Sequence, residues 1–269
     1  MAERIQLEGL LNTRDLGGYE AADNRRIRPR TLIRSGALAD MTPEDKRVLF
    51  QDYGVRTVID LRTGLEAGEK PDPGIEGVSH EFNPILDEET AGFTHENEDG
   101  GQMNMLEGFL KHAKSLNGRP EKYIGQLYKN LVLSDGAMAR YGHFLNLVLE
   151  AAPGAVLWHC SAGKDRAGMA TAFLLTALGV DRETVLTDFT LSNQYLRPET
   201  ERMMRLVKAG TADEGLERTA EVLCQVKREY LEDAFRLIEE TYGSLENYMT
   251  GQLGMDEDKL KRLRDRYLI

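Results

Sequence analysis

The stretch from residue 155 to residue 178 constrains the fold more than any other part of the sequence. Residues 155–159 are apolar except for the last, His159, and such a short run is typical of a buried strand. Residues 166–178 are again mostly apolar but have helical spacing, and Gly179 ends that helix. A buried strand that passes through a compact loop into a buried helix is characteristic of layered α/β folds.

Most of the chain repeats this alternation of strands and helices. The pattern predicts strands at 31–35, 57–62 and 78–82, and helices at 120–131 and 137–151. Strands that alternate with helices in this way predict an α/β fold with a central, mostly parallel sheet flanked by helices.

Local signals mark several boundaries. Thr42 is a good N-cap and Pro43 suits the first position of a helix, which should stop near Gly54. Residues 197–242 read as long, charged helices with one apolar stripe, and we expect most of 71–101 to be loop, with its acidic run at 96–99 in solvent.

The composition excludes several classes of protein. The net charge is −11, whereas nucleic-acid binders are more often basic, so we expect no nucleic-acid partner. No apolar stretch approaches the ~20 residues of a membrane helix, and the first eight residues lack the apolar core of a signal peptide. We therefore expect a cytoplasmic protein without an integral membrane segment. Secretion without a leader would leave no trace in the sequence, and the oligomeric state stays open.

The chain has two cysteines, Cys160 and Cys224, which are too few for a disulfide framework and indicate a reducing compartment. Cys224 lies on the apolar stripe of a predicted helix, where core packing is favoured over redox pairing with Cys160.

Cys160 stands directly after the strand at 155–159, and Arg166 opens the helix that follows. A loop at a helix N-terminus turns its backbone N–H groups inward, and the helix dipole adds positive potential, which suits a phosphoryl group. Arg166 can hold two phosphate oxygens through its planar fork. The predicted phosphate-binding residues beside it are Ser161, Ala162, Gly163, Lys164 and Ala167.

The same positive field favours the thiolate form of Cys160, which is the reactive form of a cysteine. The predicted reaction is attack by Cys160 on phosphorus, followed by hydrolysis of the phosphocysteine by water. The loop amides, Lys164 and Arg166 would stabilise the transferred charge, so we expect neither a metal nor a cofactor.

The run from His159 to Gly168, HCSAGKDRAG, resembles the HCxxGKDRTG signature of bacterial and fungal tyrosine and lipid phosphatases of the protein tyrosine phosphatase B type. Three further segments carry the same resemblance: 12–18 (NTRDLGG), 58–62 (VIDLR) and 191–196 (LSNQYL). The resemblance spans most of the chain and is thinner in 88–135 and 198–242.

This resemblance implies a single phosphatase domain over 1–269 with a protein-tyrosine-phosphatase-like fold. It also implies activity on phosphotyrosine proteins or on phosphoinositides, and Lys164 is similar to the loop lysine of phosphoinositide phosphatases. A helical lid covers the site in a known member of the family, and residues 198–242 would be its counterpart here.

Ala167 departs from the family pattern, which has threonine or serine after the arginine. That hydroxyl normally donates to the sulfur and assists breakdown of the phosphocysteine, so the second step should be slower here unless Ser161 or a water substitutes. The departure keeps two alternatives open. One is a phosphatase-like module that binds phosphorylated ligands with little turnover, and the other is a sulfur-transfer enzyme that carries a persulfide on Cys160.

The leaving group needs a proton donor, and two aspartates are candidates. Asp165 lies inside the loop, so its distance from the phosphate is fixed by sequence adjacency, and we prefer it as the general acid. Asp87 is the alternative, because related phosphatases often carry an acid on a neighbouring loop; in solvent it would be only a surface carboxylate. Either group must be protonated to donate.

Several other polar residues have simpler interpretations. We expect His159 to orient its neighbours rather than react, and Arg14 with Asp15 to fix a turn. Asp60 and Arg62 could bind phosphate, or could form an ion pair at the end of a strand.

Overall fold

The computed structural model describes residues 3–87 and 105–269, with side chains from residue 108 in the second stretch. The strands are β1 Glu3–Arg4, β2 Arg14–Asp15, β3 Leu32–Ser35, β4 Val55–Asp60, β5 Ser79–Phe82 and β6 Ala155–His159. The helices are α1 Pro43–Arg47, α2 Gly64–Glu69, α3 Met105–Ser115, α4 Pro120–Leu133, α5 Asp135–Glu150, α6 Arg166–Ala177, α7 Arg182–Tyr195, α8 Arg197–Gly210, α9 Glu214–Cys224, α10 Arg228–Tyr242, α11 Leu245–Gly251 and α12 Glu257–Tyr267, with the short turns η1 Ala22–Asn24 and η2 Val48–Asp52.

The strands form one sheet in the order β1-β2-β3-β6-β4-β5. β3, β6, β4 and β5 run parallel to one another, and β1 and β2 join antiparallel at one edge. β6 lies between β3 and β4, so the loop that follows His159 leaves the sheet at the carboxyl ends of three neighbouring parallel strands. Ligand sites in α/β sheets usually lie at that edge.

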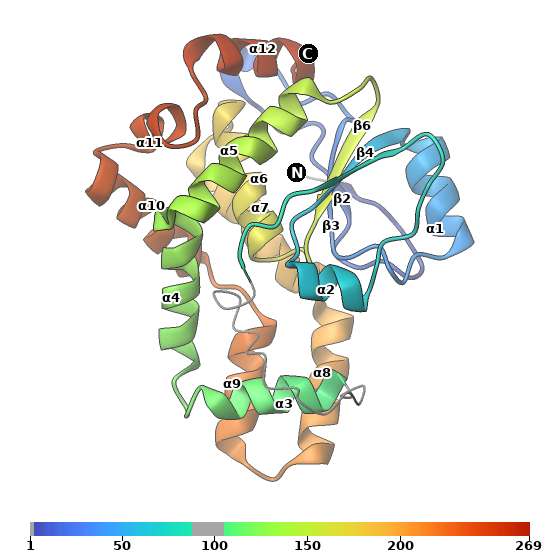
Figure 1. The fold of residues 1–269 in the computed structure, drawn as a ribbon, viewed down its shortest axis with the longest axis vertical. Coiled ribbons are helices and arrows are strands. Elements are labelled where there is room, and N and C mark those ends of the chain that lie inside the picture. Colours follow the sequence, from blue (N-terminus) through green and yellow to red (C-terminus); the bar gives the residue numbers. More distant parts are fainter. Residues whose placement is uncertain (1–2, 88–104) are drawn as a thin grey trace.

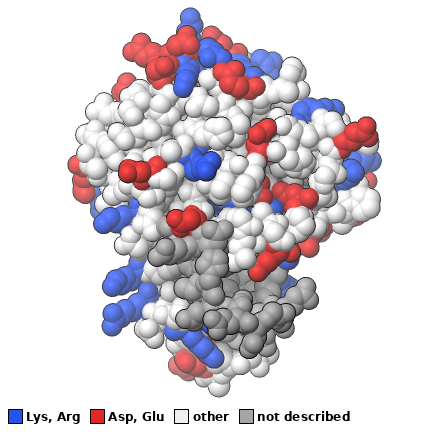
Figure 2. Space-filling model, viewed as in Figure 1, with Lys and Arg blue, Asp and Glu red and all other residues white. Residues whose placement is uncertain are grey.

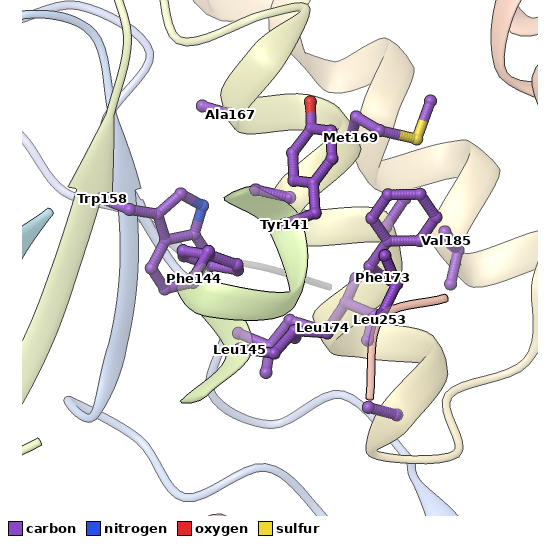
Figure 3. Packing of buried hydrophobic residues seen from close by; sticks show 14 of the residues in the cluster. Tyr141, Phe144, Leu145, Trp158, Ala167, Met169, Phe173, Leu174, Val185 and Leu253 are labelled. Atoms are coloured by element: carbon purple, nitrogen blue, oxygen red, sulfur yellow. The ribbon is translucent and has the colours of Figure 1, made fainter. Parts of the chain in front are cut away.

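Side chains alternate along β6 between two apolar cores, as the geometry of a strand requires. Val156 and Trp158 belong to the larger core, with α5 and α6, while Ala155 and Leu157 belong to a smaller core on the α1 side. Figure 3 shows Trp158 beside Phe144 of α5, and the two rings meet edge to face with centroids 5.5 Å apart. Both faces of the strand are therefore buried, which explains why it reads as a continuous apolar run.

The helix starts follow from the sequence. Thr42 caps α1 through a capping box with Asp45, and Pro43 is its first residue. Gly179 follows α6 with φ +80°, and a Cβ there would lie 2.7 Å from the Cβ of Ala22, so only glycine fits.

The helices of the C-terminal half fall into two groups (Figure 1). α10 packs with its buried face, which includes Phe235 and Ile238, in the larger core. In contrast, α8 and α9 extend away from the sheet together with α3 and share a separate small cluster around Met203, Val207 and Ala220. Cys224 packs against this cluster and is unpaired, as predicted.

The α/β prediction is confirmed, including the mostly parallel sheet. The predicted boundaries lie within a few residues of those observed, which is the ordinary scatter of helix ends. The acidic run at 96–99 lies outside the described residues. Among the helices that the structure describes, none combines the length and apolar character needed to cross a membrane.

Candidate active site

The loop after β6 is held from outside by hydrogen bonds to its carbonyl groups. The Ser161 carbonyl accepts from the backbone N–H of Ala37 at 3.0 Å, and the side-chain amide of Asn12 donates to the carbonyls of Ala162 and Gly163, both at 3.0 Å. In a planar trans peptide the C=O and the N–H point in opposite directions. Because these successive carbonyls face outward, the N–H groups that follow them face the inside of the loop.

Gly163 is required at its position for two reasons. Its φ is +70°, and a Cβ would lie 2.3 Å from the carbonyl oxygen of Ser35. The loop therefore rests directly on the end of β3, and no larger residue could follow the same path.

A buried ionic network fixes the same side of the loop. Arg34 donates to the carbonyl of Gly163 at 2.7 Å, and its other terminal nitrogen pairs with Asp188 of α7 at 2.8 Å. Arg14 also pairs with Asp188, at 2.9 Å, and donates to the side chain of Asn12 at 2.5 Å. All four side chains are buried. Asn12 and Arg34 hold the loop directly, and Asp188 links helix α7 to both arginines.

The pKa values in this network reflect burial and pairing. Burial alone would raise the pKa of Asp188, but the charges of Arg14 and Arg34 hold it below its usual value. Burial, followed by repulsion from Arg14, lowers the pKa of Arg34 to about 10, against the attraction of Asp188. Asp188 is therefore ionised at neutral pH and shared by two cations.

The opposite side of the loop faces α2. Glu66 accepts both terminal nitrogens of Arg166, at 2.5 and 2.7 Å, and also accepts the hydroxyl of Ser161. The same carboxylate closes the capping box of α2 with Thr63. Burial alone would raise the pKa of Glu66, but the hydrogen bonds and charge of Arg166 hold it at about 2. Burial would lower the pKa of Arg166, and the pairing with Glu66 raises it above its usual value.

Cys160 is the first residue of the loop, and its side chain is buried at 2% exposure. Its sulfur lies within electrostatic range of the guanidinium groups of Arg166 and Arg34 and of the Tyr141 hydroxyl. The Cys160 side chain therefore lies in the positive field of two arginines, at the border of the larger apolar core.

Asp165 is reached by a tyrosine from α4. The hydroxyl of Tyr128 donates to one carboxylate oxygen of Asp165 at 2.8 Å, and the other oxygen lies 3.4 Å from the Lys164 ammonium. The side chain of Asp165 does not cap α6, although the residue stands at the N-cap position. Lys164 itself donates to the carbonyl of Leu223 at 2.6 Å and so joins the loop to the end of α9.

The other predicted residues lie as follows. Ala167 is fully buried in the larger core, as Figure 3 shows, whereas Asp87 is exposed at the edge of the described residues. Asp15 fixes a turn by accepting the N–H groups of Gly17 and Arg30. The expectation that Arg14 fixes a turn is wrong, because its guanidinium forms the buried ion pair with Asp188 described above.

Asp60 and Arg62 form the ion pair that was one of their two interpretations, at 2.8 Å. Asp72 joins them through Arg62 at 3.0 Å, and its second oxygen lies 2.7 Å from Nε2 of His159. Asp60, Asp72 and His159 could together supply metal ligands, but Arg62 already donates to both carboxylates. This cluster is an ionic support behind Cys160, whose carbonyl is 3.4 Å from Nδ1 of His159.

The sequence reasoning missed Glu66, Tyr128, Asp188, Arg34 and Asp72. One signal existed for Glu66, because Thr63-x-x-Glu66 is a capping-box pattern directly after a buried strand. Asp188 lies one helical turn before Ser192, and Ser192 belongs to the segment 191–196 that carried the family resemblance. Tyr128 had no local signal, because its link to residue 165 spans 37 residues of chain.

Taken together, a cysteine at the end of a central strand, inward-facing loop amides and an arginine at a helix N-terminus define the class of cysteine-dependent phosphatases. The comparisons with known proteins agree. The chain matches the sequence profile described as "Tyrosine phosphatase family" over residues 5–269, and it belongs to this family.

Two bacterial relatives illustrate the relationship. The chain is 28% identical to the "Triple specificity protein phosphatase PtpB" of Mycobacterium tuberculosis, over 96% of this chain and 97% of that protein. It is 29% identical to a protein of Cupriavidus necator that is named provisionally as a tyrosine-protein phosphatase, over 98% of this chain and 88% of that protein. The similarity is therefore spread over whole chains and is not limited to the loop.

Proposed function

We propose that this phosphatase hydrolyses phosphomonoesters of phosphotyrosine proteins and phosphoinositides, through a phosphocysteine on Cys160. The observation that carries the proposal is the orientation of the loop. Its carbonyls accept hydrogen bonds on the outside of the loop, so its N–H groups point inward, where they can bind an oxyanion. Arg166 and the α6 N-terminus add positive charge at the same point. The "triple specificity" in the name of the mycobacterial relative supports a broad substrate range.

Cys160 is the proposed nucleophile, and Arg166 is the proposed clamp on the phosphate. Ser161, Ala162, Gly163 and Lys164 would line the bound group, and Ala167 would lie beside it. Glu66 keeps the guanidinium plane of Arg166 fixed before substrate arrives, which lowers the cost of ordering it. With both cysteines unpaired, we propose a reducing compartment such as the cytoplasm.

Asp165 is the proposed general acid. Tyr128 holds one of its oxygens, and the side chain is free of any helix-capping role, which supports this assignment. Asp87 is less well supported, because it is exposed and lies outside the loop, whereas Asp165 is part of the loop itself.

We further propose that 1–269 is a single phosphatase domain and that a lid is formed by α8 and α9. This is narrower than the 198–242 range suggested by the sequence, because α10 packs in the larger core while α8 and α9 share a small cluster of their own. Lys164 donates to the end of α9, so movement of α8 and α9 would break or shift this hydrogen bond to the loop.

A p-nitrophenyl phosphate assay of the wild type against Cys160→Ser tests the enzymatic proposal. We expect the variant to lose turnover by a factor of at least about 10³, because a serine hydroxyl is a much weaker nucleophile than a cysteine sulfur. Trapping of a phosphocysteine in the wild type would identify the intermediate.

Ala167 favours a second candidate, a module that binds phosphorylated ligands. Its methyl group supplies no hydroxyl to the sulfur, and the Ser161 hydroxyl donates to Glu66 instead. If the wild type bound phosphate but its turnover did not depend on Cys160, this second function would replace the first.

A further inference from the structure

The charges on α3 and α4 run against the sign of the whole protein. The chain carries a net charge of −11, yet residues 105–133 contain five lysines and arginines and only two acidic residues, Glu107 and Glu121. Figure 2 shows blue side chains gathered along the edge of the molecule where α4 lies. We name as the basic corner its five exposed cations, Lys111, Lys114, Arg119, Lys122 and Lys129.

Among the described residues, these cations differ from several exposed arginines in their ion pairing. Five exposed arginines each pair with a carboxylate at 2.9 Å or less: Arg47, Arg182, Arg228, Arg236 and Arg262. In residues 3–87 and 108–269, by contrast, no member of the basic corner forms an ion pair, and Glu121 is taken by Arg218 at 2.7 Å. Within the described residues, the corner therefore gathers five exposed cations that have no carboxylate paired with them.

A hollow of about 520 Å³ opens at the turn between the two helices. It is lined by Leu116, Asn117, Arg119, Lys122, Tyr123 and Gln126. Arginine and lysine bind phosphate, while amide and phenol groups bind hydroxyls, so the lining fits a phosphorylated polyol such as a lipid headgroup.

The hollow and the catalytic loop share α4 as a wall. Tyr123 lines the hollow, and its pKa is raised first by burial and then by the negative charge of Asp165. One and a half turns further along the same helix, Tyr128 donates to Asp165 itself. A surface bound at the corner would thus lie close to the mouth of the active site.

We propose that the basic corner docks the phosphatase on an anionic membrane surface, with the hollow taking one phosphorylated headgroup. The docked surface is wider than a single ligand, because a free polyol phosphate in the hollow would leave Lys111, Lys114 and Lys129 without a role. Attraction to anionic lipids increases with each lysine or arginine held near the leaflet. The inference rests on the proposed function, from which it selects phosphoinositides in membranes as the substrate class.

Vesicle binding tests the proposal in the Cys160→Ser background, where turnover does not consume lipid. The test variant is Arg119→Glu, Lys122→Glu, Lys129→Glu. The control, Arg197→Glu, Arg236→Glu, Arg262→Glu, makes the same change in net charge at exposed arginines elsewhere. We expect the corner variant to bind phosphatidylserine-containing vesicles at least about tenfold more weakly than the control, with no binding of either to pure phosphatidylcholine. Binding should also weaken as salt is added.

Equal loss in the two charge variants, or no vesicle binding by the parent protein, would overturn the docking proposal. Tight binding of inositol hexakisphosphate without vesicle binding would also overturn it, in favour of a soluble ligand. A loss confined to acidic phosphopeptides would indicate a protein partner instead. Turnover of p-nitrophenyl phosphate by the corner variant with Cys160 restored keeps the two proposals separate: normal turnover without docking would leave the phosphatase assignment intact.

Discussion

The two sides of the catalytic loop are supported in different ways. On the β3 side, Arg14, Arg34 and Asp188 form a network whose side chains are at most 1% exposed. On the α2 and α4 side, Glu66 and Asp165 are 10% and 19% exposed, and each is reached by a side chain from another element. The first side binds the backbone of the loop, while the second side binds the groups that would meet the substrate.

This difference indicates a division of labour. Buried charges are costly to leave unpaired, so the inner network specifies one loop conformation and should act mainly on stability. Groups on the α2 and α4 side, which we call the rim, can exchange partners when a phosphate enters, so they should act on chemistry as well as on stability. Substitutions on each side can break or sharpen this comparison.

The largest effect is expected at the centre of the inner network. Asp188→Asn removes the one carboxylate shared by two buried arginines, and we expect a loss of about 3–5 kcal/mol in the free energy of unfolding, measured by urea denaturation at pH 7. The control is Asp233→Asn, which breaks an exposed pair with Arg236 and should cost less than about 1 kcal/mol. Similar losses in the two variants would show that the network contributes no more than a surface ion pair.

For the rim, we predict how acid changes the stability of the folded protein. The pKa of Glu66 is held at about 2 instead of its usual 4.5, so its carboxylate stabilises the folded state above pH 4.5 and this contribution is lost as the pH falls toward 2. Since one pKa unit corresponds to about 1.4 kcal/mol, the full contribution is on the order of 3 kcal/mol.

The variant Glu66→Gln isolates this contribution. The difference in unfolding free energy between wild type and variant should be largest at pH 7 and should shrink steadily below pH 4.5. Other carboxylates that titrate in acid, including Asp72 and Asp188, are common to both proteins and cancel in the difference. A difference that stayed constant from pH 7 to pH 3 would mean that the charge of Glu66 is not the source.

Only part of the β3 side of the site could be predicted from the sequence. The strand at 155–159, the loop and the helix at 166–178 could be predicted because each depends on neighbouring residues. The segment at 12–18 was noticed, but its role was not, because Asn12 acts on a loop 150 residues away. Asp188 was missed for the same reason, since local pattern does not reveal which distant cations a helical aspartate will meet.

Even less of the rim could be predicted from the sequence, because the positions of its side chains depend on how the helices pack. Tyr128 reads as one more apolar position of α4, and only the packing of α4 against α10 and α7 turns its hydroxyl toward the loop. Glu66 reads as a helix cap, which it is, and the cap also aims its carboxylate at Arg166.

The smallest effect is expected for Tyr128→Phe, which removes only the hydroxyl that holds Asp165. Burial and the charge of Asp165 raise the pKa of Tyr128 well above its usual value, so the phenol stays a donor throughout the assay range. We expect kcat to fall about tenfold for phenyl phosphate, whose leaving group needs the proton, and to change little for p-nitrophenyl phosphate, which needs it less. Asp165→Asn should show the same selectivity with a larger loss.

The matched control is Tyr230→Phe, because this ring packs against Tyr128 with centroids 5.5 Å apart. Its buried hydroxyl has no hydrogen-bond partner in the described part of the chain. It should therefore leave both substrates unaffected. If Tyr128→Phe lowered kcat equally for the two substrates, the hydroxyl would be supporting the loop as the inner network does, and the division between the two sides would not hold.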